Sequence, residues 1–136
     1  MFKFNRVVCV LLVGSCVAIA YGKAVKVTGI TPTPESPESA DADGMAILNY
    51  HPGQDLTEVQ VALTGFMPYT DYKVLVSGAG VVNIIITTNA AGNGSGHNTG
   101  VGDMTRDDNG DPFCIVVEVT KDGETDLRAD GSVNCS

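Results

Sequence analysis

The alternation of large apolar side chains with polar or small ones between positions 58 and 64 constrains the fold of this chain most strongly. Residues 57–64 read Thr-Glu-Val-Gln-Val-Ala-Leu-Thr. Successive side chains of a β-strand point to opposite faces, so a period of two predicts a strand with one buried face. The stretch 72–77 repeats the pattern, whereas 81–88 and 113–120 are apolar, β-branched runs that suit central strands. No window of about a dozen residues shows helical periodicity with caps.

Turn signals separate these stretches at intervals of roughly 8 to 12 residues, which is typical of an all-β sandwich. We expect strands near 24–30, 44–50, 57–64, 72–77, 81–88, 113–120 and 125–129. The pattern therefore predicts an antiparallel β-sandwich, immunoglobulin-like in the broad sense, with seven to eight strands. The polar faces of the alternating strands exclude a parallel sheet buried on both sides. The expected core consists of Ile47, Val59, Val61, Leu63, Tyr72, Val74, Val76, Ile84, Ile86, Ile115, Val117 and Val119.

One local segment resembles a known family. Residues 63–74 read Leu-Thr-Gly-Phe-Met-Pro-Tyr-Thr-Asp-Tyr-Lys-Val, and Pro68, Thr70 and Tyr72 match the strand–corner–strand motif of fibronectin type III and related immunoglobulin-like modules. The resemblance implies that the Tyr72 ring packs inward while its hydroxyl bonds to upstream backbone. The chain departs from that family because it contains no Trp. Such a resemblance implies a scaffold, often adhesive or ligand-binding, with no activity of its own.

The first 22 residues have the pattern of an export signal. Lys3 and Arg6 precede an apolar run over 7–20, and small residues suit cleavage near Ala20 or Gly22. The run is shorter than the roughly 20 apolar residues of a membrane span. We therefore expect a signal peptide over 1–22, a first strand and Pro-rich linker over 23–43, and a β-sandwich domain over 44–136. A long loop between two strands is the alternative to the linker.

Cleavage of the signal would remove Cys9 and Cys16 and leave Cys114 and Cys135. Exported proteins meet oxidising conditions, so these two cysteines predict one disulfide. It would close a loop of about 20 residues, worth about 3 kcal/mol in the chain-entropy model. The alternative is a lipoprotein anchored at Cys16, although the residues after Cys16 are apolar where lipoprotein tethers are usually polar. An uncleaved membrane anchor is a third possibility. The expected location is secreted, periplasmic or at the cell surface.

The chain is acidic, with a net charge of −8, and loss of Lys3 and Arg6 with the signal would leave −10. Such a chain repels phosphate backbones, and this excludes nucleic acid as a partner. We expect an unidentified protein or glycan partner and no stable membrane span after cleavage. Exposed sheet edges leave the oligomeric state open.

Residues 89–111 are rich in glycine and predict a long mobile connection or a meandering edge segment, and this is the first place to look for a binding surface. A phosphate cradle is excluded because no helix follows. Asp103, Asp107, Asn109 and Asp111 crowd together, and their oxygens suit a hard cation. The EF-hand pattern fails because Pro112 stands where glycine is required. A looser calcium site and a solvated acidic loop both remain as hypotheses.

The sequence offers no catalytic set. His51 and His97 are far apart, no Cys-x-x-Cys pair occurs, and Ser95 misses the Gly-x-Ser-x-Gly pattern by one position. The leading hypothesis is an exported, non-catalytic binding or structural module of the cell exterior, without a cofactor. A calcium-stabilised adhesion-type module is the second hypothesis, and a small secreted hydrolase is the third.

Overall fold

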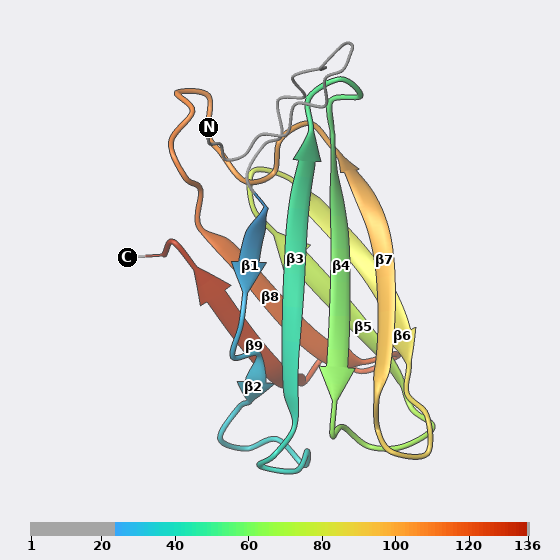
Figure 1. Cartoon of the computed structure of the whole chain (residues 1–136). Coiled ribbons are helices and arrows are strands. Elements are labelled where there is room, and N and C mark those ends of the chain that lie inside the picture. The colour runs from blue at the N-terminus through green and yellow to red at the C-terminus, as the bar shows by residue number, and fades with distance from the viewer. Residues whose placement is uncertain (1–23, 136) are drawn as a thin grey trace, which may run out of the picture.

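The computed structural model describes residues 24–135, so the predicted signal peptide, with Cys9 and Cys16, lies outside the described residues. The described residues form two antiparallel sheets and no helix, which confirms the all-β sandwich (Figure 1). The strands number nine, one or two more than predicted: β1 Val25–Val27, β2 Thr31–Pro32, β3 Asp43–His51, β4 Leu56–Thr64, β5 Asp71–Ser77, β6 Val81–Thr87, β7 Gly94–Val101, β8 Ile115–Lys121 and β9 Leu127–Val133. Across this part of the chain, no helix has the length and apolar character needed to traverse a bilayer.

The first sheet has the strand order β1-β3-β4-β7, and the second has the order β2-β9-β8-β5-β6. Three hairpins pair consecutive strands: β3 with β4, β5 with β6, and β8 with β9. The connections β4–β5, β6–β7 and β7–β8 cross from one sheet to the other. These crossings bring the strands of the two sheets face to face around one interior.

The interior is built as the alternation predicts. Eleven of the twelve expected core residues are buried, and Val59, Val74 and Ile115 are fully so. Ile47 is the exception, because its side chain is only half-buried on the outer face of β3, and Ala46 and Leu48 point inward instead. Ala46, Ile47 and Leu48 are all apolar, so the sequence does not indicate which of them face inward. The pairing register of β3 places the side chains of Ala46 and Leu48 in the interior.

The predicted strand 24–30 is split between the sheets. Strand β1 joins β3, the chain turns at Gly29 with a φ of +70°, and β2 joins β9. The Pro-rich segment that follows is a loop between β2 and β3, and Glu38 in this loop is buried. Of the two alternatives weighed above, the packed loop describes this segment.

Of the two alternatives for the glycine-rich segment, the edge segment describes its first half, because this half contains β7. This strand pairs with β4 from Leu63↔Gly94 to Leu56↔Val101 and forms the edge of its sheet. Glycine disfavours strands, so the sequence pattern hides this one. A Cβ atom on Gly96 would lie 2.7 Å from Ile84 Cγ2, which means that glycine lets β7 lie directly on β6.

Four connections gather at one end of the sandwich, the lower end in Figure 1. They are the β2–β3 loop (33–42), the β4–β5 loop (65–70), the β6–β7 loop (88–93) and the β8–β9 loop (122–126). We call this region the four-loop end. The turn between β3 and β4, the β5–β6 turn and the long β7–β8 connection lie at the opposite end.

Candidate functional site

A buried ion pair ties the four-loop end together. The guanidinium of Arg128, on β9, donates to Glu38 Oε2 at 2.7 Å and to Glu124 Oε1 at 2.9 Å. The side chains of Glu38 and Arg128 are 0 % and 8 % exposed. A buried carboxylate lowers the stability of the folded protein unless it is paired and hydrogen-bonded. The ion pair with Arg128 therefore fixes the position of Glu38 and, with it, the β2–β3 loop. The sequence analysis missed this pair, because its members are 90 positions apart and no local pattern connects them.

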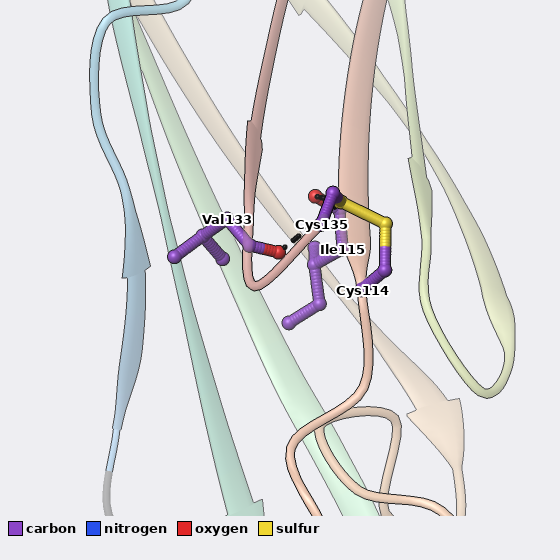
Figure 2. Close-up of a disulfide and its surroundings, with 4 residues drawn as sticks. All are labelled: Cys114, Ile115, Val133 and Cys135. Atoms are coloured by element: carbon purple, nitrogen blue, oxygen red, sulfur yellow. Dashed lines mark hydrogen bonds between the residues drawn. A yellow bond between two sulfur atoms is a disulfide. The ribbon is translucent and has the colours of Figure 1, made fainter.

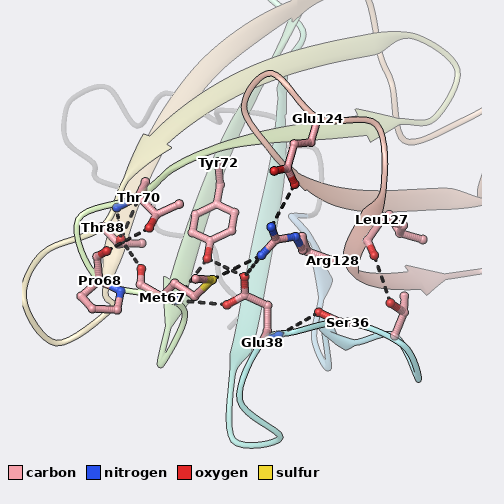
Figure 3. Close-up of polar contacts among 11 residues, drawn as sticks. Ser36, Glu38, Met67, Pro68, Thr70, Tyr72, Thr88, Glu124, Leu127 and Arg128 are labelled. Atoms are coloured by element: carbon pink, nitrogen blue, oxygen red, sulfur yellow. Dashed lines mark hydrogen bonds and ion pairs between the residues drawn. The ribbon is translucent and has the colours of Figure 1, made fainter.

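Tyr72 joins this network from the start of β5. Its hydroxyl donates to Glu38 Oε2 at 2.6 Å and accepts a hydrogen bond from the backbone N–H of Met67 at 3.1 Å. Its ring packs edge-on against Phe66, with 5.2 Å between the ring centroids. The expected bond from the Tyr72 hydroxyl to upstream backbone is therefore present (Figure 3). Burial, followed by the hydrogen bond to Glu38, raises the pKa of Tyr72 above its usual value.

The network fixes the β4–β5 loop from both sides. The N–H of Met67 also donates to Glu38 Oε1 at 3.0 Å, and Arg128 lies 3.3 Å from the Met67 sulfur. On the other side, the Thr88 hydroxyl donates to Met67 O at 2.6 Å and accepts from the N–H of Thr70 at 2.9 Å. Figure 3 shows these contacts converging on the loop. Within the described residues, every buried side-chain nitrogen and oxygen has a partner.

The tip of this fixed loop presents an aromatic side chain to solvent. Tyr69 is 77 % exposed, and its backbone adopts a φ of +53°. Positive φ is uncommon for a bulky residue and persists only where the surroundings enforce it. Here the N–H of Tyr69 donates to Asn89 O at 3.3 Å, and Met67, two positions earlier in the sequence, is 38 % exposed. The structure thus holds an aromatic ring at a tip whose backbone is already ordered.

The predicted calcium residues lie in the β7–β8 connection, at the opposite end. Asp103 Oδ1 accepts bonds from the N–H and hydroxyl of Thr105, and Asp107 Oδ1 accepts bonds from the N–H groups of Asn109 and Asp111. The described residues contain no group of three or more His, Cys, Asp or Glu side chains arranged to hold a metal. The calcium site stays a prediction. In the structure, the carboxylates of Asp103 and Asp107 accept hydrogen bonds from nearby backbone N–H groups and thereby stabilise turns.

Ser95 and His97 both lie on β7, where their side chains are exposed on the outer face of the sheet. They border a shallow hollow of about 320 Å³, whose apolar lining includes Met45, Ile47 and Ala62. His51 lies elsewhere, 3.5 Å from Glu58. The structure therefore does not bring the two histidines together.

The expected disulfide is present. It joins Cys114, directly before β8, to Cys135, two residues after the end of β9 (Figure 2). The two cysteines are 21 positions apart, and their Cα atoms are 4.5 Å apart. The bond closes the β8–β9 hairpin at the side away from its turn. No free cysteine occurs between residues 24 and 135.

No protein-family model, no curated protein and no solved structure matches the chain significantly.

Proposed function

We propose that this protein is an exported, non-catalytic binding module that engages a partner through its four-loop end. The sandwich serves as the scaffold, and the loops provide the contact surface. The observation that carries this proposal is the exposure of Tyr69, which is 77 % exposed at the tip of a loop whose backbone is bonded to two other segments, the β2–β3 loop and the β6–β7 loop.

Rigid display of an aromatic side chain favours binding for a physical reason. Association costs entropy whenever a loop must become ordered, and a loop that is ordered beforehand avoids this cost. Tyrosine is enriched at the centre of protein interfaces because it offers a large, stiff contact area with one polar tip. Tyr69 offers such a contact area, and the backbone of its loop is ordered before a partner binds.

Two further features support a location outside the cytoplasm. The basic start and apolar run of the first 22 residues have the composition of an export signal. The Cys114–Cys135 bond also suits an oxidising compartment. The test of this part is mass spectrometry of the mature protein, which reads the cleavage point, any lipid on Cys16 and the disulfide together.

The binding proposal is tested with the mature protein on an array of glycans and extracellular peptides and proteins. We expect Tyr69→Ala to remove the strongest signals. The matched control is Val101→Ala, because Val101 is 92 % exposed but lies at the end of β7, away from the four loops. Equal losses from both variants would contradict the proposal. Turnover of any substrate in a hydrolase screen of the same preparation would do so as well.

A further inference from the structure

The four loops beside Tyr69 share an unusual charge pattern. Together they contain Glu35, Glu38, Asp41, Asp122, Glu124 and Asp126, and no Lys or Arg. Glu38 is neutralised by the buried Arg128, and Glu124 shares the same guanidinium. The remaining carboxylates have no basic side chain within these loops. The nearest lysines in sequence, Lys73 and Lys121, belong to strands β5 and β8.

Two of these acidic residues, Asp41 and Asp122, adjoin the aromatic loop through their backbone, as do Asp43 at the start of β3 and Asp71 at the start of β5. Asp43 pairs with Thr64, and Asp41 O lies 3.3 Å from where a Cβ of Gly65 would stand. On the far side of the loop, the N–H of Asp122 donates to Asp71 O at 2.9 Å. Acidic residues therefore border the loop before Gly65 and after Thr70, whereas its tip is apolar and aromatic. This arrangement complements a cationic group that also has a flat face.

We propose that the four-loop end docks a basic, arginine-containing segment of a partner protein, with a guanidinium stacked on Tyr69 and neighbouring basic groups facing the carboxylates of Asp41 and Asp122. This inference rests on the proposed binding function. A guanidinium is planar, stays charged and stacks on aromatic rings, which makes arginine a better occupant than lysine. A neutral glycan would gain no charge attraction from the surrounding carboxylates, and a nucleic acid would be repelled by them.

The test measures binding of a fluorescein-labelled, alternating Arg-Gly nonapeptide to the mature protein by anisotropy at 50 mM NaCl. We expect Tyr69→Ala to weaken binding about three- to fivefold, the range of an exposed cation–π contact. Tyr69→Phe keeps the ring and should retain most of the affinity. Tyr69→Asn is the second truncation, because Asn tolerates the positive φ of this position. A Lys-Gly peptide should bind more weakly than the Arg-Gly peptide.

Two double variants separate a specific site from general attraction between a cation and an acidic protein. Asp41→Asn with Asp122→Asn should weaken binding and reduce its dependence on salt. Asp55→Asn with Asp108→Asn removes the same charge from two exposed residues at the opposite end, in the β3–β4 turn and the β7–β8 connection, and should leave affinity unchanged. Equal losses from the two double variants would overturn the inference.

The outcomes also separate this inference from the proposed function. Failure of the Arg-Gly peptide to bind, together with Tyr69-dependent binding of a glycan, would overturn the basic partner and leave the binding module standing. If Tyr69→Ala changes binding of no ligand, both proposals are wrong. Melting temperatures of the Tyr69 variants close to that of the wild-type protein would exclude unfolding as the cause of any loss.

Discussion

The Tyr72 hydroxyl donates a 2.6 Å hydrogen bond to Glu38 Oε2. Tyr72 is the second residue of strand β5, whereas Glu38 belongs to the Pro-rich β2–β3 loop. Glu38 and Tyr72 are 34 positions apart, and both are buried. Together with the bond from Met67 N–H to Glu38 Oε1, this contact joins the β2–β3 loop to the crossing between the sheets. The order of the four-loop end therefore depends on it.

Replacing Tyr72 with Phe keeps the ring and removes the hydroxyl. A hydrogen bond to a charged group contributes about 1.5–3 kcal/mol, so we expect the free energy of unfolding at pH 7 to fall by that amount. Urea denaturation followed by circular dichroism measures it. Phe66→Leu serves as a control that disturbs the ring contact but not the hydrogen bond. An unchanged midpoint in Tyr72→Phe would show that the contact contributes nothing.

The same residue predicts a dependence on alkaline pH. The pKa of Tyr72 is raised from 10.0 in the folded protein, mainly by burial and then by the hydrogen bond to Glu38, so folding favours the protonated phenol. Its contribution is complete below pH 10 and is lost as pH rises from there toward the folded-state pKa. We expect the stability difference between wild type and Tyr72→Phe to shrink above pH 10. A difference that stays constant to pH 11.5 would contradict this.

The Glu38–Arg128 pair should respond asymmetrically to mutation. Removing one member leaves a buried charge without its partner, at a cost of about 3–5 kcal/mol. We therefore expect Arg128→Met and Glu38→Met each to destabilise strongly, and the double variant to be more stable than either single one. A double-mutant cycle in urea isolates the coupling. Additive losses would mean that the two residues act independently.

The all-β sandwich was largely predictable from the sequence, since most of its strands show local alternation. Val59, Val61 and Leu63 face inward as the period of two requires. The disulfide was predicted because only Cys114 and Cys135 lie outside the predicted signal peptide. Ile47, which was expected in the core but is only half-buried, shows the limit of this reasoning. In the uninterrupted Ala-Ile-Leu run, no polar residue indicates which side chains face inward.

The candidate site was not predictable by the same reasoning. Glu38 lies in the predicted Pro-rich linker and Arg128 in the predicted strand 125–129, and only the fold brings their side chains within 2.7 Å. The exposure of Tyr69 depends on a backbone conformation that neighbouring loops impose. Strand β7 escaped notice because its inward positions carry Gly94, Gly96 and Gly100, which lack the side chains that mark a strand.

The close packing of the glycines of β7 against strand β6 leads to a separate prediction about stability. A Cβ at Gly96 would stand 2.7 Å from Ile84 Cγ2 and 3.2 Å from Ile86 Cγ1, inside ordinary contact distance. We expect Gly96→Ala to cost about 1–3 kcal/mol through overpacking of the core. Gly53→Ala is the matched control, because nothing lies within 4 Å of its Cβ position. A melting temperature for Gly96→Ala equal to that of Gly53→Ala would show that the sheets can separate without cost.

The disulfide should stabilise mainly by restricting the unfolded chain. With 21 positions between Cys114 and Cys135, the chain-entropy model gives about 3 kcal/mol. We expect Cys114→Ala with Cys135→Ala to lower the free energy of unfolding by that amount and to raise the denaturant m-value, since an unlinked chain exposes more surface. Reduction of the wild-type protein with dithiothreitol should reproduce the effect, and the double variant should not respond to the reductant. A double variant as stable as the oxidised protein would mean that the hairpin strands alone already fix this part of the sheet.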